Sequence, residues 1–223
     1  MAKHPSTQDI KLAVDAAIFT VQDGVFKTLL IQMKKKPFEG RWAFPGGLLE
    51  DHEACEGAAR RILAEATGMK EAYLEQLGTF DDPGRDPFGR VVSVAYFALM
   101  PSEGVELRTV EKYADVRWWP VAELPPLAYD HREVARVAAA RIRAKLGYTN
   151  VVWSLLPKTF TLADLQSVYE SILGRRLDKR NFRKKVLASK LLESTGKLEK
   201  GGAHRPAELF RFAARRLAHV ELL

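Results

Sequence analysis

The stretch from Glu53 to Gly68 constrains the fold of this 223-residue chain more than any other. It is rich in alanine and has no proline, and after Gly57 no glycine interrupts it until Gly68. A glycine directly after such a run commonly ends a helix, because it adopts the left-handed conformation without strain. The pattern predicts a helix over Glu53–Thr67 that stops at Gly68.

Apolar, β-prone runs surround this helix. Val14–Val21 and Val25–Gln32 are separated by a Gln-Asp-Gly turn, which predicts an antiparallel hairpin. Further strands are expected over Arg90–Leu99 and Asp115–Trp119. His131–Leu146 carries apolar residues at helical spacing and predicts a second long helix. These elements together predict a body of mixed α/β (α+β) architecture.

The composition of the chain changes near residue 150. The helical pattern breaks at Gly147, and Pro157 ends the apolar stretch that follows. We therefore expect a first domain over 1–147, a linker over 148–157 and a second, small domain over 158–223.

The second domain has the pattern of a winged helix-turn-helix. Thr161-Leu162-Ala163-Asp164 predicts a capped helix start and Gly174 its end, while Asp178 is expected to cap the next helix. In that helix we expect Phe182, Val186 and Leu187 to face inward. A basic, glycine-containing tip from Lys197 to Pro206 and the alternating run after it predict a hairpin wing.

The net charge of +7 is concentrated in this second half. Residues 151–223 carry 15 Lys and Arg against 7 Asp and Glu, whereas the rest of the chain carries 20 against 21. Such a tail is typical of a polyanion partner, although a solvated basic surface has the same composition. No apolar run approaches the ~18 residues of a membrane helix, and the first residues lack a signal-peptide core, so we expect a cytoplasmic protein without a membrane partner.

The spacing from Gly47 resembles the Nudix box, Gly-x5-Glu-x7-Arg-Glu-U-x-Glu-Glu-x-Gly-U, in which U is a bulky aliphatic residue. The matching residues, preceded by the lead-in "RWAFPGG", are Gly47, Glu53, Arg61, Glu65 and Gly68. In working Nudix hydrolases three carboxylates on one helix face hold Mg²⁺ against a pyrophosphate. Here Ile62 and Ala66 occupy two of these positions. We therefore assign no catalytic residue and no metal ligand, leave weak Mg²⁺ binding open, and interpret Glu65 as an ion-pair partner of Arg61.

A pocket can persist after catalysis is lost, and binding without turnover suits a sensor. The loop over 80–90 carries Arg85 and Arg90, which are either phosphate contacts or solvated surface arginines. Tyr129 and His131, at the entry to the long helix, offer a second polar cluster, although a histidine there is more often a cap or surface residue. The predicted ligand contacts are Arg41, Phe44, Gly46, Gly47, Arg85, Arg90, Tyr129 and His131.

The degenerate box followed by a basic winged helix resembles one family, the Nudix-related transcriptional regulators of NAD metabolism (NrtR). The marks are "RWAFPGG", "DDPGRDPFGRVVSVAY", "YDHREV", "FTLADLQSVYESILGRRLDKRNFRKKVL" and "RPAELFRF". The resemblance implies a homodimer that represses genes of NAD biosynthesis or salvage. It also implies that ADP-ribose, bound as an effector and without any required cofactor, releases the operator DNA. Related members respond to sugars such as arabinose.

The DNA contacts implied by this assignment lie on the second helix and the wing of the small domain. Cations on the helix are expected to contact phosphates, while Arg180, Asn181 or Arg183 reach base edges. The predicted residues are Thr161, Lys179, Arg180, Asn181, Arg183, Lys184, Lys185, Lys197, Lys200, His204 and Arg205. Two alternatives remain: an ADP-ribose pyrophosphatase with an accessory winged helix, and a winged helix that contacts proteins only.

Overall fold

The computed structural model describes residues 9–69, 71–109, 111, 113–199 and 206–220. The strands are β1 (Lys11–Gln22), β2 (Val25–Met33), β3 (Trp42–Ala43), β4 (Gly46–Leu48), β5 (Tyr73–Phe80), β6 (Val91–Leu99), β7 (Tyr113–Pro120), β8 (Phe160–Thr161), β9 (Leu192–Leu198) and β10 (Glu208–Phe212). The helices are α1 (Cys55–Thr67), α2 (His131–Tyr148), α3 (Leu162–Leu173) and α4 (Lys179–Ala188), with short 3-10 turns η1 (Val121–Glu123) and η2 (Val151–Ser154).

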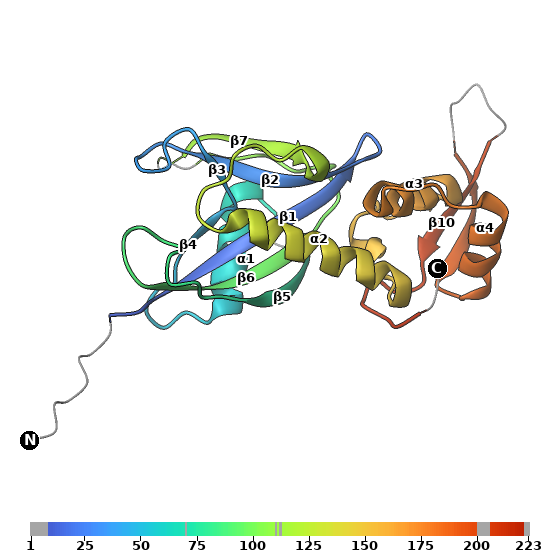
Figure 1. Ribbon diagram of the computed structural model, residues 1–223. Helices are drawn as coiled ribbons and strands as arrows, with labels where there is room; N and C mark the ends of the chain where they lie inside the picture. Colours follow the sequence, from blue (N-terminus) through green and yellow to red (C-terminus); the bar gives the residue numbers. More distant parts are fainter. Residues whose placement is uncertain (1–8, 70, 110, 112, 200–205, 221–223) are drawn as a thin grey trace, which may run out of the picture.

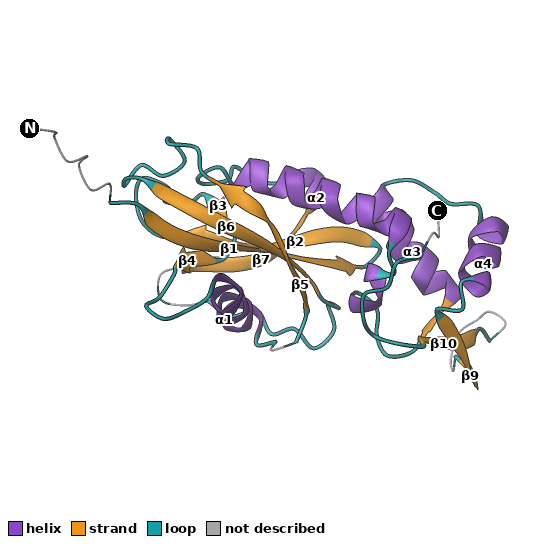
Figure 2. Cartoon of the chain, turned by 90° about the horizontal axis from the view of Figure 1, so that it is seen from below, coloured by secondary structure: helices purple, strands orange, loops and turns teal. Residues whose placement is uncertain are grey.

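The first domain is a mixed sheet covered by one helix on each side. Its strand order is β3-β2-β1-β6-β5, with β4 added to β1 and β7 added to β2. The β1–β2 hairpin and the other predicted strands are present, and β1 runs parallel to β6. Helices α1 and α2 lie on opposite faces of this sheet (Figure 2). The apolar residues of each strand therefore divide between two cores, one under each helix.

Helix α1 begins two residues later than predicted. Ala54 precedes it in an extended conformation, so Glu53 lies outside the helix. The predicted end is confirmed: Gly68 has φ 71° and its N–H donates to the carbonyl of Ala64. Among the described residues, no helix is long and apolar enough to cross a membrane.

The second domain packs two helices on a three-stranded sheet of order β8-β10-β9. The predicted caps are present: Thr161 and Asp164 form a capping box at α3, and Asp178 accepts from the Asn181 N–H at α4. Gly174 ends α3 with φ 67°. Five buried residues hold α3 and α4 in the core: Leu165, Tyr169, Ile172, Phe182 and Val186.

Helix α2 is the longest helix and connects the two domains. It crosses the first domain and its far end reaches α3 (Figure 1). Within the segment expected as a linker over 148–157, Tyr148 ends α2 and Val151–Ser154 form η2, in which Val151 and Val152 are fully buried. They belong to an apolar core that runs continuously from the sheet into the winged helix. The segment is therefore packed rather than extended.

Candidate ligand pocket and nucleic-acid interface

The Nudix-box helix holds an arginine among carboxylates. Arg61 binds Glu53 through two hydrogen bonds, Nε to Oε1 at 2.9 Å and Nη2 to Oε2 at 2.8 Å. Its Nη1 lies 3.5 Å from Glu65 Oε1, so the predicted Arg61–Glu65 ion pair is present, although Glu53 is the nearer partner. These hydrogen bonds from Arg61 hold the pKa of the Glu53 carboxyl below its usual range.

The two positions that lack carboxylates point into the core. Ile62 and Ala66 are buried against the sheet, with 4% and 6% of their surface exposed. The remaining carboxylates, Glu53 and Glu65, both pair with the Arg61 guanidinium. Magnesium requires several oxygen ligands in near-octahedral geometry. The residues of this box do not fit such a site, and within the described residues no cluster of three His, Cys, Asp or Glu side chains is arranged to hold a metal ion.

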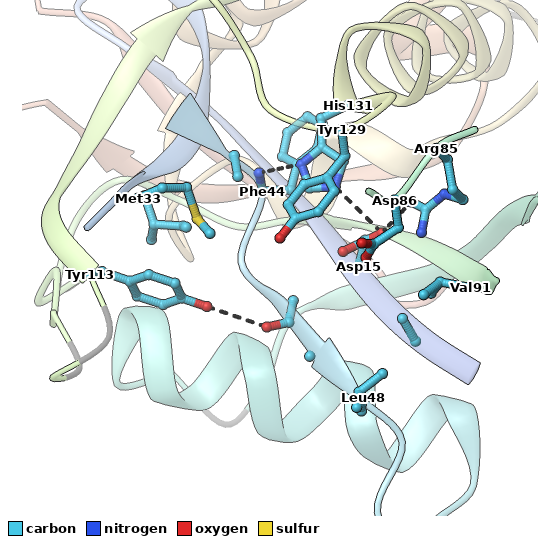
Figure 3. A pocket seen from close by; sticks show the side chains of 15 residues that line it. Asp15, Met33, Phe44, Leu48, Arg85, Asp86, Val91, Tyr113, Tyr129 and His131 are labelled. Carbon is cyan, nitrogen blue, oxygen red and sulfur yellow. Dashed lines mark hydrogen bonds and ion pairs between the residues drawn. The ribbon is translucent and has the colours of Figure 1, made fainter. Parts of the chain in front are cut away.

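A cavity of about 240 Å³ lies beside the box, at the start of β4. Its walls include Asp15 from β1, Phe44 from the loop before β4, Arg85 from the β5–β6 loop, and His131 from α2 (Figure 3). Segments far apart in the sequence therefore meet here.

Asp15 is the centre of the polar wall. Ser93 Oγ donates to its Oδ2 at 2.5 Å, Arg85 Nη2 lies 3.2 Å from the same oxygen and His131 Nε2 lies 3.5 Å from it. Burial raises the pKa of the Asp15 carboxyl, but the charge and hydrogen bonds of these neighbours outweigh it and lower the pKa to about 2. Asp15 is therefore an anion held inside the protein.

Arg85 joins this anion to the start of α2. Its Nε and Nη2 donate to the two carboxylate oxygens of Asp130 at 3.0 and 2.8 Å, a bidentate pair. Only 3% of its side chain is exposed. Arg85 is therefore neither a solvated surface arginine nor a free phosphate ligand: its guanidinium is committed to Asp15 and Asp130.

His131 is likewise buried, with 2% of its surface exposed, rather than a cap or a surface residue. Its Nδ1 accepts a hydrogen bond from the Phe44 N–H at 2.9 Å. The other ring nitrogen, Nε2, faces Asp15, so the imidazole lies between the Phe44 backbone and the buried carboxylate. The first residue of α2 thus positions the loop that forms the cavity.

Gly46 is the residue that makes room for this arrangement. It pairs with Asp15 across β4 and β1, and a Cβ built on it would lie 2.2 Å from Asp15 Oδ1. Any side chain at this position would displace the buried carboxylate. The glycine is therefore required by the pocket, not only by the turn into β4.

Six of the predicted ligand residues line the cavity: Phe44, Gly46, Gly47, Arg85, Tyr129 and His131. Arg41 lines an adjoining hollow of about 810 Å³, whose walls also include Arg85 and Tyr129. Arg90 lines neither space, and its Nη1 donates to the carbonyl of Asp81 at 2.5 Å. Asp15 and Ser93 were not among the predicted site residues. The available signal for Asp15 was a single acid within an otherwise apolar strand.

The second candidate site is the cationic surface of α4. Lys179, Arg180, Asn181, Lys184 and Lys185 are exposed there. Arg183 is half-buried, and its Nε has no hydrogen-bond partner among the described residues. Arg175 and Arg176, in the turn before α4, are exposed and share a hollow of about 220 Å³ with Asn181 and Lys185. These two arginines extend the predicted surface.

Two predictions on this domain are wrong. Thr161 is not available to DNA, because it is 96% buried and its hydroxyl is committed to the capping box with Asp164. Leu187 does not face inward, since 51% of its surface is exposed. On the wing, Lys197 is exposed on β9, while Lys200, His204 and Arg205 lie outside the described residues.

Both domains match known families. A model of the NUDIX domain matches residues 10–139, and a model of the NrtR DNA-binding winged helix domain matches residues 152–212. A protein of Acinetobacter baylyi, described as the ADPR responsive transcriptional repressor NtrR, is 38% identical over 207 residues, covering 91% of this chain and 82% of the relative.

Solved structures agree with this assignment. Shewanella oneidensis NrtR complexed with a 27mer DNA is 36% identical, with a TM-score of 0.80, over 90% of this chain and 93% of that one. The Nudix domain of that protein, complexed with ADP ribose, is 35% identical, with a TM-score of 0.55, over 63% and 94%. These likenesses confirm the predicted fold class, a Nudix-like domain followed by a winged helix-turn-helix, and the chain belongs to the NrtR family.

Proposed function

We propose that this protein is a DNA-binding transcriptional repressor whose Nudix domain binds ADP-ribose, and that the bound nucleotide releases the DNA. The A. baylyi relative is described as a repressor responsive to this compound, and the S. oneidensis relative was solved with each ligand. We propose genes of NAD biosynthesis or salvage as targets. Because its partner is operator DNA, we place the protein in the cytoplasm.

One observation carries the proposal: a single helix begins in the pocket and ends at the winged helix. His131 at the start of α2 lines the cavity, and Asp130 just before it binds Arg85. Near the other end, Arg143 Nε donates to the carbonyl of Ile172 in the last turn of α3 at 2.9 Å. A ligand that moves the Asp130–His131 segment therefore acts on α3 through one rigid element.

The proposed ligand site comprises the cavity and the adjoining hollow, which share Arg85 and Tyr129. Together they suit an elongated nucleotide rather than a single sugar. Arg41 is exposed on the hollow and forms no ion pair with the described residues, so we assign it the diphosphate. Tyr129 lines both spaces, so we assign it to contact the base or ribose.

The DNA partner is proposed to be a two-fold pseudo-palindrome bound by a homodimer. Each α4 enters a major groove, and the half-sites lie about one helical turn (~34–36 Å) or a multiple apart. ADP-ribose must then bind better to the arrangement that misplaces the two helices. A differential of about 1–3 kcal/mol changes DNA affinity roughly 5–150-fold.

The test is a gel shift of the full-length protein on the DNA upstream of its own gene, with and without ADP-ribose. We expect a retarded complex that ADP-ribose dissociates. Arabinose in a parallel lane tests the sugar-responsive alternative, and AMP release in Mg²⁺ buffer tests the pyrophosphatase alternative. Unchanged binding in ADP-ribose would exclude it as the effector, and absence of any complex would contradict the repressor.

A further inference from the structure

The outward face of α4 is fixed by its buried residues. Phe182 and Val186, four positions apart, are 4% and 1% exposed and anchor the helix in the domain core. Residues at positions i, i+4 and i+7 share one face of a helix. Arg180, Lys184 and Leu187 have this spacing, and all three are exposed. They form the face opposite the anchors, and we call them the α4 outer face.

Leu187 is the unexpected member of the α4 outer face. A single exposed leucine on a protein surface needs no explanation. This one, however, lies on the α4 outer face, one turn beyond Lys184, and the second helix of a helix-turn-helix enters the major groove. Its 51% exposure leaves about half of the residue's surface free to be buried by a partner, and the neighbouring cations favour a polyanion as that partner.

The chemistry of the major groove indicates which DNA group Leu187 contacts. Base edges there present hydrogen-bond donors and acceptors, and the apolar group among them is the 5-methyl of thymine. Arginine and lysine read guanine O6 and N7, whereas a leucine cannot pair with any of the polar atoms. Among the base edges, a leucine on this face gains the most free energy where it meets a thymine methyl.

We propose that Leu187 is a specificity-determining residue that packs on a thymine 5-methyl group in the major groove, one helical turn along α4 from Lys184. This inference rests on the proposed DNA-binding function and adds a base preference to it. The residues beside the outer face, Arg183 and Lys185, then lie toward the two walls of the groove, where they contact phosphates. Leu187 thus selects sequence, while its cationic neighbours position the helix.

The experiment uses the full-length protein and removes only the methyl group. A duplex is selected from a random-sequence library by the wild-type protein, and its thymines are then replaced one at a time by uracil. For the wild type we expect at least one replacement, in each half-site, to lower affinity about fourfold, the contribution of one buried methyl group. For Leu187→Ala the same replacement changes affinity less than about 1.5-fold, because the contacting side chain is gone.

Two further variants sharpen this comparison. Leu187→Met keeps an apolar side chain of similar reach, and we expect it to retain the sensitivity to uracil. Leu217→Ala is the control: it removes a leucine that is 40% exposed and lies outside α4. We expect its sensitivity to uracil to equal that of the wild type. Folding does not confuse the result, since Leu187 is exposed and its removal leaves no cavity.

The outcomes separate this inference from the function on which it rests. Selective DNA binding in which no uracil replacement distinguishes the wild type from Leu187→Ala would overturn the role of Leu187 and leave the repressor intact. It would assign the leucine to another partner, such as a second copy of the chain. Failure to select any sequence would overturn the DNA-binding function, and this inference with it.

Discussion

The protein places its charges in two opposite ways. In the pocket, Asp15, Arg85 and Asp130 are paired with one another, and the side chains of Asp15 and Arg85 are almost completely buried. On α4, Lys179 and Lys184 are exposed and form no ion pair with the described residues. The first group is held in one geometry by the fold, whereas the second is left available to a partner.

The difference shows how one chain separates sensing from DNA binding. Buried charges are costly to desolvate, so each must be compensated, and the loss of one partner is felt throughout the network. Exposed cations cost little in the folded protein, and their attraction to phosphates depends on salt. Four variants test this comparison, from the largest expected effect to the smallest.

The first variant breaks the pocket network. Arg85→Ala leaves Asp15 and Asp130 without their shared cation, so we expect the free energy of unfolding to fall by about 3–5 kcal/mol. Urea denaturation of the full-length protein measures this change. Arg117→Ala is the control: its ion pair with Asp115 involves a side chain that is 64% exposed, and less than about 1 kcal/mol is expected. Equal effects of the two variants would contradict the comparison.

The second test concerns the pH dependence of stability. The carboxyl of Asp15 has a pKa of about 2 in the folded protein against 3.8 as the ordinary value, so the folded state favours the anion. This contributes about 2 kcal/mol that is fully present above about pH 5 and is lost as pH falls toward 2. Between pH 6 and pH 3 the wild type should therefore lose about 1 kcal/mol more than Asp15→Asn, measured by urea denaturation at each pH.

An exposed acid provides the control for this profile. The side chain of Asp23 is 84% exposed, and Asp23→Asn should follow the pH profile of the wild type. Parallel profiles for the wild type and Asp15→Asn would show that Asp15 does not contribute the buried anion described above.

The third variant addresses the connection between the two regions. Arg143→Ala removes the hydrogen bond from α2 to the Ile172 carbonyl of α3. We expect DNA and ADP-ribose each to bind nearly as before, while the effect of ADP-ribose on DNA affinity weakens by about 0.5–2 kcal/mol. DNA titrations at saturating ADP-ribose measure this coupling. Arg132→Ala, an exposed change at the pocket end of α2, should leave it unaltered. If ADP-ribose lowered the DNA affinity of Arg143→Ala as much as that of the wild type, the Arg143–Ile172 hydrogen bond would be excluded as the route of coupling.

The last variant concerns a single phosphate contact. Lys185→Ala should reduce the slope of log affinity against log salt by about 0.9, because one fewer counterion is released from the DNA. Filter binding between 50 and 200 mM salt measures this slope, and ADP-ribose affinity should not change. Lys34→Ala, in the first domain, is the charge-matched control. A slope identical to that of the wild type would show that Lys185 does not contact a phosphate.

The sequence predicted the features that depend on nearby residues. Gly68 and Gly174 as helix ends, and Asp178 as a cap, follow from the conformations and hydrogen bonds of a few neighbours. The spacing of the Nudix box likewise lies within one segment, and the family resemblance extended it to the whole fold. The interactions of neighbouring residues were therefore sufficient to predict the helix ends, the cap and the box.

The pocket network depends on residues that are far apart in the sequence. Asp15 meets Ser93 because β1 and β6 pair in parallel, and it meets Arg85 because the β5–β6 loop brings that guanidinium within hydrogen-bond distance. No local pattern marks such a meeting. Leu187 was wrongly predicted to face inward. It directly follows the buried Val186, and consecutive helix residues are rotated by about 100°, so its side chain lies beyond the buried face of α4. The contacts at Lys200, His204 and Arg205 remain predictions.

Helix α2 has a mechanical consequence. Its 18 residues span about 27 Å at 1.5 Å per residue. It therefore acts as a lever: a tilt of about 5° at the pocket end displaces the far end by about 2 Å. In the proposed two-fold dimer, opposite movements of the two ends change the distance between the recognition helices by about 4 Å. That is a large fraction of the ~12 Å width of a major groove. A change too small to disturb the buried pocket would be enough to move two helices out of register with their DNA.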